Sequence, residues 1–155
     1  MNIGIIVYSG TGNTLSVAQK LEEKLRADGH TVALEQVKVS GWTRQEPTRF
    51  TLTATPEVDS YDAVVFASSV LAFNLVPPMA RYLEQIGPLD GKPVALLITK
   101  HLPLYITGGR QAVGKMTKLC KSKGGQVLGS GYVIWSSPRR QEMIAEAVEK
   151  VGGLL

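Results

Sequence analysis

The sequence predicts an α/β protein with a doubly wound, five-stranded parallel sheet and helices on both faces. Two observations lead to this prediction. Short apolar runs alternate along the chain with segments whose apolar residues recur at helical spacing, which is typical of βαβ units. Connections between successive parallel strands are right-handed, so the alternating elements form a doubly wound sheet with helices on both faces. The 155 residues are expected to form a single domain, 1–155.

The first half of the chain begins with the clearest elements. Residues 3–8 form an unbroken apolar run, as expected of a strand covered on both faces. Residues 15–26 carry an apolar stripe at helical spacing, and Gly29 is expected to stop this helix. Residues 31–39 alternate and carry charges, which predicts a second strand near a sheet edge. Residues 41–59 are rich in threonine and contain two prolines, so we expect a loop with no more than one turn.

The second half repeats the alternation of strand and helix. The helix after the third strand is opened by Pro77 and Pro78, because proline is tolerated in a first helical turn. The next helix is expected over residues 110–122, and Pro138 is expected to open a terminal helix. The three remaining strands are predicted over residues 63–67, 93–99 and 126–134.

Composition excludes several classes of protein. One cysteine, Cys120, excludes an internal disulfide framework and a multi-cysteine zinc or iron–sulfur site, and we expect no metal site. No apolar run approaches the ~20 residues that span a bilayer. The first residues lack the basic region of a signal peptide, so a cytoplasmic protein without membrane contact is expected. The net charge of +4 either reflects ordinary solubility or favours anionic partners.

The strongest functional signal is the segment between the first strand and the first helix. Its two glycines allow a tight turn that brings backbone N–H groups close to a ligand. The helix behind it adds unpaired N–H groups and the positive end of its dipole. Three hydroxyls, one amide and no cation suit a terminal phosphate monoester, although a simple βα turn is the alternative. The six residues are Ser9, Gly10, Thr11, Gly12, Asn13 and Thr14.

These six residues match the phosphate loop of the flavodoxin family, T/S-x-T-G-N-T, and the chain resembles short-chain members of that family over its whole length. Residues 61–70 resemble the family's third strand and flavin loop, and residues 77–83 resemble the helix that follows. The resemblance implies strand order 2-1-3-4-5 and non-covalent FMN, with its ring between loops 68–74 and 99–109. It makes the following residues candidate FMN contacts beside the phosphate loop: Ser68, Ser69, Val70, Leu71, Ala72, Phe73, Asn74, Thr99, Lys100, His101, Tyr105 and Gly108.

Both flavin loops depart from the pattern of acidic electron carriers in that family. The first offers Phe73, which either stacks on the ring or fills the core, and the second offers Tyr105, which we expect to line the site. Neither loop contains Asp, Glu or Trp. Lys100 and His101 either face solvent or lie near the ring, where we expect them to raise the flavin potential by roughly tens of millivolts.

The resemblance implies two functions. The first is an electron carrier, a monomer or homodimer, that exchanges electrons with a reductase or acceptor protein. A run of basic residues on the third helix, continued in the segment before the last helix, suggests that this partner is acidic. The run lacks the interleaved aromatic residues of a nucleic-acid site, so we do not expect nucleic acid as a partner. The second is an FMN-dependent oxidoreductase that takes hydride from NAD(P)H and reduces a quinone. The short chain favours the carrier, whereas the lack of acidic residues favours the enzyme. A third possibility is a member that has lost flavin.

Four other features of the sequence are weaker indications of function. Gly10-x-Gly12-x-x-Leu15 lacks the third glycine of a dinucleotide-binding motif, and Glu35 falls inside a strand instead of at its end. Cys120 lies on the buried face of its predicted helix, so it is expected to be an inert core thiol. Trp42 is a candidate anchor for a subunit contact, and Trp135 is a candidate for the site rim or a partner contact.

Overall fold

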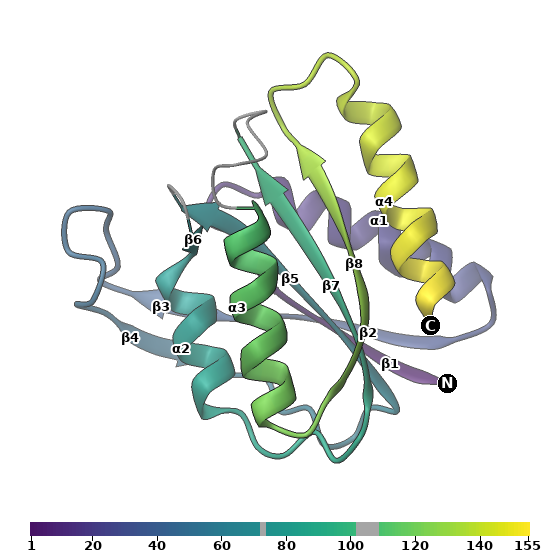
Figure 1. Cartoon of the computed structure of the whole chain (residues 1–155), viewed down its shortest axis with the longest axis horizontal. Helices are drawn as coiled ribbons and strands as arrows, with labels where there is room; N and C mark the ends of the chain where they lie inside the picture. Colours follow the sequence, from purple (N-terminus) through teal and green to yellow (C-terminus); the bar gives the residue numbers. More distant parts are fainter. Residues whose placement is uncertain (72–73, 102–108) are drawn as a thin grey trace.

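The computed structural model describes residues 1–71, 74–101 and 109–155 (Figure 1). Strands and helices alternate along most of the chain, as the hydrophobic periodicity predicts. The elements are β1 (Asn2–Tyr8), α1 (Asn13–Ala27), β2 (Thr31–Gln36), β3 (Lys38–Ser40), β4 (Thr51–Ala54), β5 (Ala63–Leu71), β6 (Asn74–Leu75), α2 (Pro77–Gln85), β7 (Pro93–Lys100), α3 (Gly109–Ser122), β8 (Gln126–Ile134) and α4 (Arg140–Leu154).

The central sheet is parallel, and its strand order is β2-β1-β5-β7-β8. This is the order 2-1-3-4-5 of the predicted fold class, which is therefore confirmed. The short β6 pairs antiparallel with the end of β5. Helices α1 and α4 cover one face of the sheet, and α2 and α3 cover the other (Figure 1).

Two hydrophobic cores lie on the two faces because side chains alternate along each strand. Ile5 and Leu97 point into the core beneath α1 and α4, whereas their neighbours Ile6 and Leu96 point into the core beneath α2 and α3. All four side chains are fully buried. Burial of each such side chain contributes roughly 1.5–3 kcal/mol, so the unbroken apolar runs hold both helical layers on the sheet.

The predicted loop is confirmed over residues 41–50 and 55–59, but it is wrong for Thr51–Ala54, which form β4. An antiparallel hairpin of β3 and β4 occupies this region, with Val39 opposite Leu52 and Ser40 opposite Thr51. The predicted strand 31–39 is divided between β2 and β3. Alternating threonines favour short strands, and Leu52 packs against the core beneath α2 and α3. The connection from β2 to β5 thus carries a short antiparallel hairpin, which the sequence analysis did not predict.

The remaining element bounds differ little from the predictions. The third strand is longer than expected, because β5 continues from Ala63 to Leu71 and includes the start of the predicted flavin loop. The terminal helix begins at Arg140, two residues after the proline that was expected to open it. As Figure 1 shows, β1, β5 and β7 end on the same side of the molecule, so the loops that follow them converge there.

Candidate functional site

A pocket of about 300 Å³ lies where β1, β5 and β7 end, and we name it the carboxyl-edge pocket. The crevice beyond the carboxyl ends of parallel strands is the usual ligand site of doubly wound sheets. Nine of the residues predicted from the sequence line this pocket together. They are Gly10, Thr11 and Asn13 from the phosphate loop, Ser69, Val70 and Leu71 from β5, and Thr99 and Lys100 from β7, joined by His101 directly after β7.

The phosphate loop leads into α1 through Gly12, whose φ of 92° lies in the left-handed region. A Cβ at this position would meet nothing within 4 Å, so the backbone angle and not crowding requires glycine. The Ser9 hydroxyl accepts a hydrogen bond of 3.0 Å from the Gly12 N–H. No side chain of the described residues caps α1. The first N–H groups of α1 therefore remain available to an anion, as a phosphate site requires.

Thr14 and Thr99 connect the phosphate loop to the end of β7. Their Oγ1 atoms lie 2.6 Å apart in a hydrogen bond, and both side chains are buried. Three residues of the phosphate loop do not line the carboxyl-edge pocket: Ser9, Gly12 and Thr14. The hydrogen bond fixes the first turn of α1 against the third strand of the site.

The predicted flavin loops are only partly described. The Ser68 side chain is buried and its hydroxyl donates to the Ser69 carbonyl oxygen at 3.0 Å. Asn74 is exposed, and its Oδ1 accepts a hydrogen bond from the Leu75 N–H. Neither Ser68 nor Asn74 lines the pocket. The expected contacts of four further residues lie outside the described residues and stay predictions: Ala72, Phe73, Tyr105 and Gly108.

The hairpin contributes two pocket residues that the sequence analysis did not assign to the site, Trp42 and Arg44. The Trp42 ring meets the Tyr8 ring edge-to-face, with centroids 6.5 Å apart. The Trp42 Nε1 atom is buried and has no hydrogen-bond partner among the described residues. A buried donor without a partner is rare in folded proteins, and it indicates that this wall suits an acceptor atom of a ligand.

Trp135 also lines the carboxyl-edge pocket, in agreement with its predicted place at the site rim. Its backbone N–H donates to the Lys100 carbonyl oxygen at 2.7 Å. The Arg140 guanidinium lies 4.8 Å from the centre of the Trp135 ring and donates to the Trp135 carbonyl oxygen at 3.1 Å. The first bond holds the segment after β8 against the end of β7, and the two Arg140 contacts join this segment to the start of α4.

The charge of the pocket wall is positive. Arg44, Lys100 and His101 line it, and none of the described residues in its wall is acidic. Lys100 lines the pocket and is 8% exposed as a residue, so it does not extend freely into solvent, and its position near a flavin ring stays a prediction. Burial lowers the pKa of Lys100 below its ordinary value. His101 is exposed, and its carbonyl oxygen accepts a hydrogen bond from the Ser136 hydroxyl.

The described part of the chain gives no support to four other kinds of feature: a metal site, a membrane-spanning helix, a reactive thiol and a dinucleotide-binding motif. Within residues 1–71, 74–101 and 109–155, no group of three or more His, Cys, Asp or Glu side chains could hold a metal ion. Over the same ranges, no helix is both long and apolar enough to cross a bilayer. Cys120 is fully buried, and burial raises the pKa of its thiol to about 12, consistent with an inert thiol. Glu35 lies within β2 and accepts a hydrogen bond from the Tyr61 hydroxyl.

Comparison with known sequences gives one distant relative. The chain is 26% identical over 126 residues to the NAD(P)H dehydrogenase (quinone) of Archaeoglobus fulgidus. The match covers 70% of this chain, which spans 64% of the length of that curated relative. No protein-family model matches the chain.

Comparison with solved structures gives full-length matches. A short-chain flavodoxin associated with a non-canonical PDU bacterial microcompartment has a TM-score of 0.71 and 14% identity, over 100% of this chain and 96% of that one. Oxidised flavodoxin 1 of Bacillus cereus has a TM-score of 0.69 and 14% identity, over 99% and 96% of the two chains. A flavoprotein in complex with FMN from Lactobacillus acidophilus has a TM-score of 0.63 and 18% identity, over 94% and 97%. The strand order, the helical layers and these matches together show that the chain has the flavodoxin fold.

Proposed function

We propose that this protein binds FMN non-covalently in the carboxyl-edge pocket and serves as an electron carrier. The observation that carries the proposal is the uncapped N-terminus of α1 behind Gly12, at the phosphate-loop position of a flavodoxin fold. A similar structure, the Lactobacillus acidophilus flavoprotein, is a complex with FMN, which supports the assignment of the cofactor.

The residues of the pocket fit this cofactor. The N–H groups of the phosphate loop and the first turn of α1 suit a phosphate dianion. The buried Trp42 Nε1 offers a donor without a partner among the described residues, as a pocket built for a ligand acceptor would. The pocket volume of about 300 Å³ falls in the range of small-molecule sites.

The residues of the chain have distinct roles in this proposal. Residues 9–14 hold the phosphate, and the bond from Thr14 to Thr99 keeps that loop aligned with the end of β7. Trp42 and Tyr8 form an aromatic wall that excludes water. Bound FMN supplies the redox chemistry, since its ring accepts and returns electrons.

Lys100 is the residue that we expect to adjust the flavin potential. The residue lines the pocket and is largely buried, and its cation favours the more negative, reduced form of a nearby flavin. A unit charge at about 4 Å interacts by about 4 kcal/mol at an effective dielectric of 20, and screening reduces this to a shift of tens of millivolts. The protein is therefore proposed to be a weaker reductant than acidic flavodoxins, which a potentiometric titration tests.

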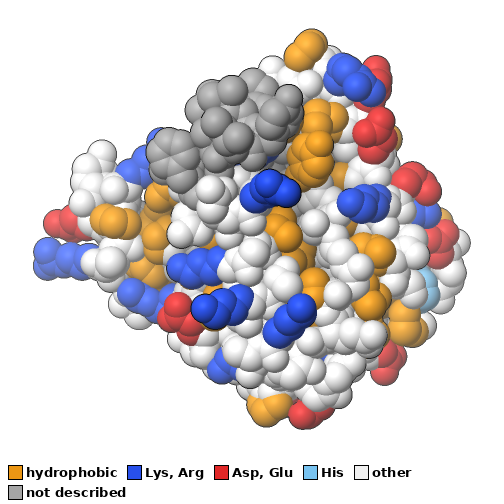
Figure 2. Space-filling view, viewed as in Figure 1, with side chains coloured by type: hydrophobic (Ala, Val, Ile, Leu, Met, Phe, Trp, Pro, Cys, Tyr) orange, Lys and Arg blue, Asp and Glu red, His pale blue; other side chains and the backbone are white. Residues whose placement is uncertain are grey.

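A basic surface supports an acidic protein as the redox partner. Lys115, Lys118 and Lys121 extend along α3, and Figure 2 shows Lys and Arg side chains over this region. Opposite charges steer encounter and make the association rate fall with salt. The proposal predicts that electron exchange with an acidic partner slows as ionic strength rises, while exchange with a basic partner does not.

Calorimetry with FMN and riboflavin tests the cofactor assignment. The two compounds differ only in the phosphate, so they separate the contribution of the phosphate loop from that of the ring. We expect FMN to bind at least about 100-fold more tightly, which corresponds to about 2.8 kcal/mol. Equal affinities would contradict the phosphate site, and no heat with FMN would remove the proposed function.

A second candidate function is an FMN-dependent NAD(P)H:quinone oxidoreductase. The observation that favours it is the match to the NAD(P)H dehydrogenase (quinone) of Archaeoglobus fulgidus. The carrier remains our first proposal because the chain spans only 64% of that relative but the full length of several flavodoxins. Steady-state oxidation of NAD(P)H by the FMN-loaded protein with a quinone separates the two: turnover supports the enzyme, and its absence supports the carrier.

A further inference from the structure

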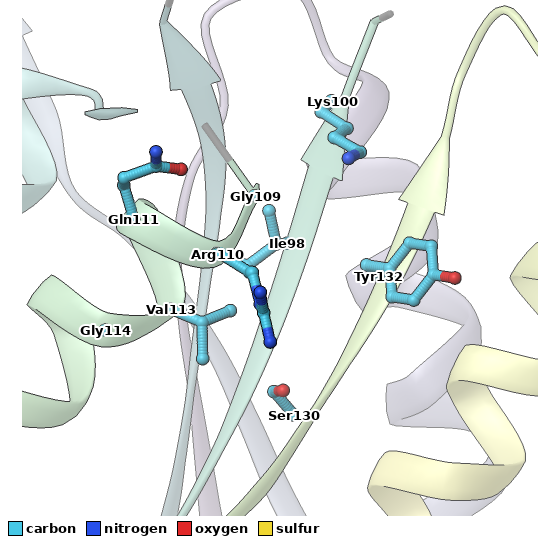
Figure 3. Close-up of a pocket in the computed structure, with 9 residues that line it drawn as sticks. All are labelled: Ile98, Lys100, Gly109, Arg110, Gln111, Val113, Gly114, Ser130 and Tyr132. Atoms are coloured by element: carbon cyan, nitrogen blue, oxygen red, sulfur yellow. The ribbon is translucent and has the colours of Figure 1, made fainter. Parts of the chain in front are cut away.

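A larger pocket lies between α3 and the β7–β8 pair, and we name it the α3–β8 pocket (Figure 3). Its volume is about 850 Å³, within the range of small-molecule sites. Its lining residues come from three elements: Ile98 and Lys100 from β7, Gly109, Arg110, Gln111, Val113 and Gly114 from α3, and Ser130 and Tyr132 from β8. Lys100 also lines the carboxyl-edge pocket, so the two pockets are neighbours.

The pocket exists because the helices cover the two faces of β8 unequally. On one face, Gly131 lies so close to α4 that an added Cβ would be 2.8 Å from Val151 Cγ2. On the other face, Tyr132 pairs in register with Ile98, which points toward α3. Tyr132 nevertheless remains 54% exposed. An aromatic ring on the α3 side of the sheet is thus left open at the pocket rim.

Two cations approach this open space. The Lys100 ammonium lies 5.9 Å from the centre of the Tyr132 ring. In Figure 3 the Arg110 side chain extends from the start of α3 into the space between α3 and β8. None of the described residues that line the pocket is acidic. The wall therefore attracts an anion, and a guanidinium can hold a planar anionic group through two parallel hydrogen bonds.

Gly114 widens the pocket where it borders α3. Glycine is unfavourable in the interior of a helix, yet Gly114 lies in the middle of α3. A Cβ added there would meet nothing within 4 Å, so packing inside the chain does not require glycine. Because Gly114 lines the pocket, the missing side chain leaves room beside Val113 for a molecule that lies against the helix.

We propose that the α3–β8 pocket binds a small anionic molecule that carries a planar aromatic ring. Arg110 and Lys100 hold the anionic group, and the ring lies against Tyr132, Ile98 and Val113. Two chemical sources share this description, an acidic quinone and a pyridine nucleotide. The inference does not depend on FMN, because none of its steps uses the phosphate loop.

The first test uses naphthalene-2-sulfonate as the probe and naphthalene-2-sulfonamide as its neutral match. Calorimetry on the full chain, with and without FMN, measures both affinities. We expect the sulfonate to bind at least about tenfold more tightly than the sulfonamide, because only the sulfonate carries the charge. Equal affinities, or no binding of the sulfonate, would overturn the proposal. Binding of the sulfonate to a chain that fails to bind FMN would support this site and reject only the proposed function.

Matched variants locate the probe. Arg110→Gln is expected to weaken sulfonate binding about tenfold, whereas Lys118→Gln, an exposed cation on the same helix outside the pocket, changes it less than about twofold. Gly114→Ala is expected to weaken binding about fivefold while the melting temperature does not fall. Gly153→Ala is its control, since that glycine of α4 also has open space around its Cβ. Equal losses within either pair would overturn the assignment to this pocket.

Competition then identifies the source of the ligand. A sulfonated naphthoquinone and NADPH are each titrated against the bound probe. Displacement by the quinone alone indicates an acceptor site, and displacement by NADPH alone indicates a donor site. If neither competes while the probe still requires Arg110, the anionic aromatic class is supported and both sources are excluded.

Discussion

The carboxyl-edge pocket and the α3–β8 pocket share Lys100 but attract anions by different means. The first relies on backbone N–H groups that Gly12 and the start of α1 hold in place. The second relies on two side chains, Lys100 and Arg110, that come from different elements. Fixed backbone dipoles need no ordering when a ligand arrives, whereas an exposed side-chain cation such as Arg110 is screened by salt and loses rotamer freedom. If both pockets bind as proposed, we expect the first to be selective for a phosphate and the second to be more tolerant and more sensitive to salt.

The largest expected effect is the loss of FMN affinity when Gly12, at the start of α1, is replaced. Gly12→Ala forces a side chain into the left-handed region, which costs about 1–2 kcal/mol and displaces the N–H groups that face the phosphate. We expect FMN affinity to fall at least about 100-fold and sulfonate binding in the α3–β8 pocket to remain unchanged. Calorimetry with both ligands measures the two affinities.

Gly29 provides the matched control for this variant. It lies just beyond α1 with a φ of 93°, and a Cβ there also meets nothing within 4 Å. Gly29→Ala should therefore lower the free energy of unfolding by a similar amount, about 1–2 kcal/mol, without the loss of FMN affinity. If both variants lost FMN equally, the effect of Gly12 would come from global stability and the phosphate site would lose its support.

The next largest effect concerns the bond between Thr14 and Thr99. Thr14→Val or Thr99→Val leaves the other buried hydroxyl without its partner, which costs about 1–3 kcal/mol of unfolding free energy. The double variant removes both hydroxyls, so its cost should be clearly less than the sum of the two single costs. Denaturant unfolding of the three variants measures this coupling, and strict additivity would contradict a direct bond.

The comparison also explains what could be predicted from the sequence. The phosphate loop consists of six consecutive residues between an apolar run and a helix, so its position between β1 and α1 could be predicted, whereas its binding of phosphate stays a prediction. The strand order followed from resemblance and from the rules of parallel sheets. Thr14 shows the limit even here, because its buried partner Thr99 lies 85 positions away in the chain.

Residues that reach a site through long-range packing were not predicted. Trp42 and Arg44 lie in the loop that joins β3 to β4, and they line the carboxyl-edge pocket. Strands of three and four residues are too short to show a clear period, so this hairpin could not be predicted. Tyr132 joins Lys100 only through the register of β7 and β8, which shifts between Val94 and Ala95. A pattern along one segment contains no information about such a register.

Lys100 lines both pockets, so Lys100→Met tests the role of this cation in each of them. Loss of the cation is expected to weaken sulfonate binding about tenfold and to lower the flavin potential by tens of millivolts. His101→Gln is the control, because an exposed group next in sequence is screened and should shift the potential less. Potentiometry and calorimetry measure the two effects. An unchanged potential in Lys100→Met would separate Lys100 from the flavin.

The pH dependence of stability tests the burial of the same residue. Because burial lowers the pKa of Lys100, the folded chain binds its proton less tightly than the unfolded chain does. The resulting penalty is present below the folded-state pKa and disappears as pH rises toward the ordinary value of 10.5. The stability of the wild type relative to Lys100→Met should therefore increase over this alkaline range, as measured by denaturant unfolding. A constant difference would show that the ammonium is solvated.

The smallest expected effect concerns Trp42, whose indole N–H is buried without a partner among the described residues. Trp42→Phe keeps a ring against Tyr8 and removes the orphaned donor, so the lost contact area and the relieved desolvation oppose each other. We expect the free energy of unfolding to change by less than about 1 kcal/mol while FMN affinity falls about three- to tenfold. Trp135→Phe is the control, since it lines the same pocket and its indole is not an orphaned buried donor. If FMN affinity fell equally in both variants, the size of the ring and not the Trp42 donor would determine binding. The first pocket would then depend on its side chains as well as on its backbone N–H groups.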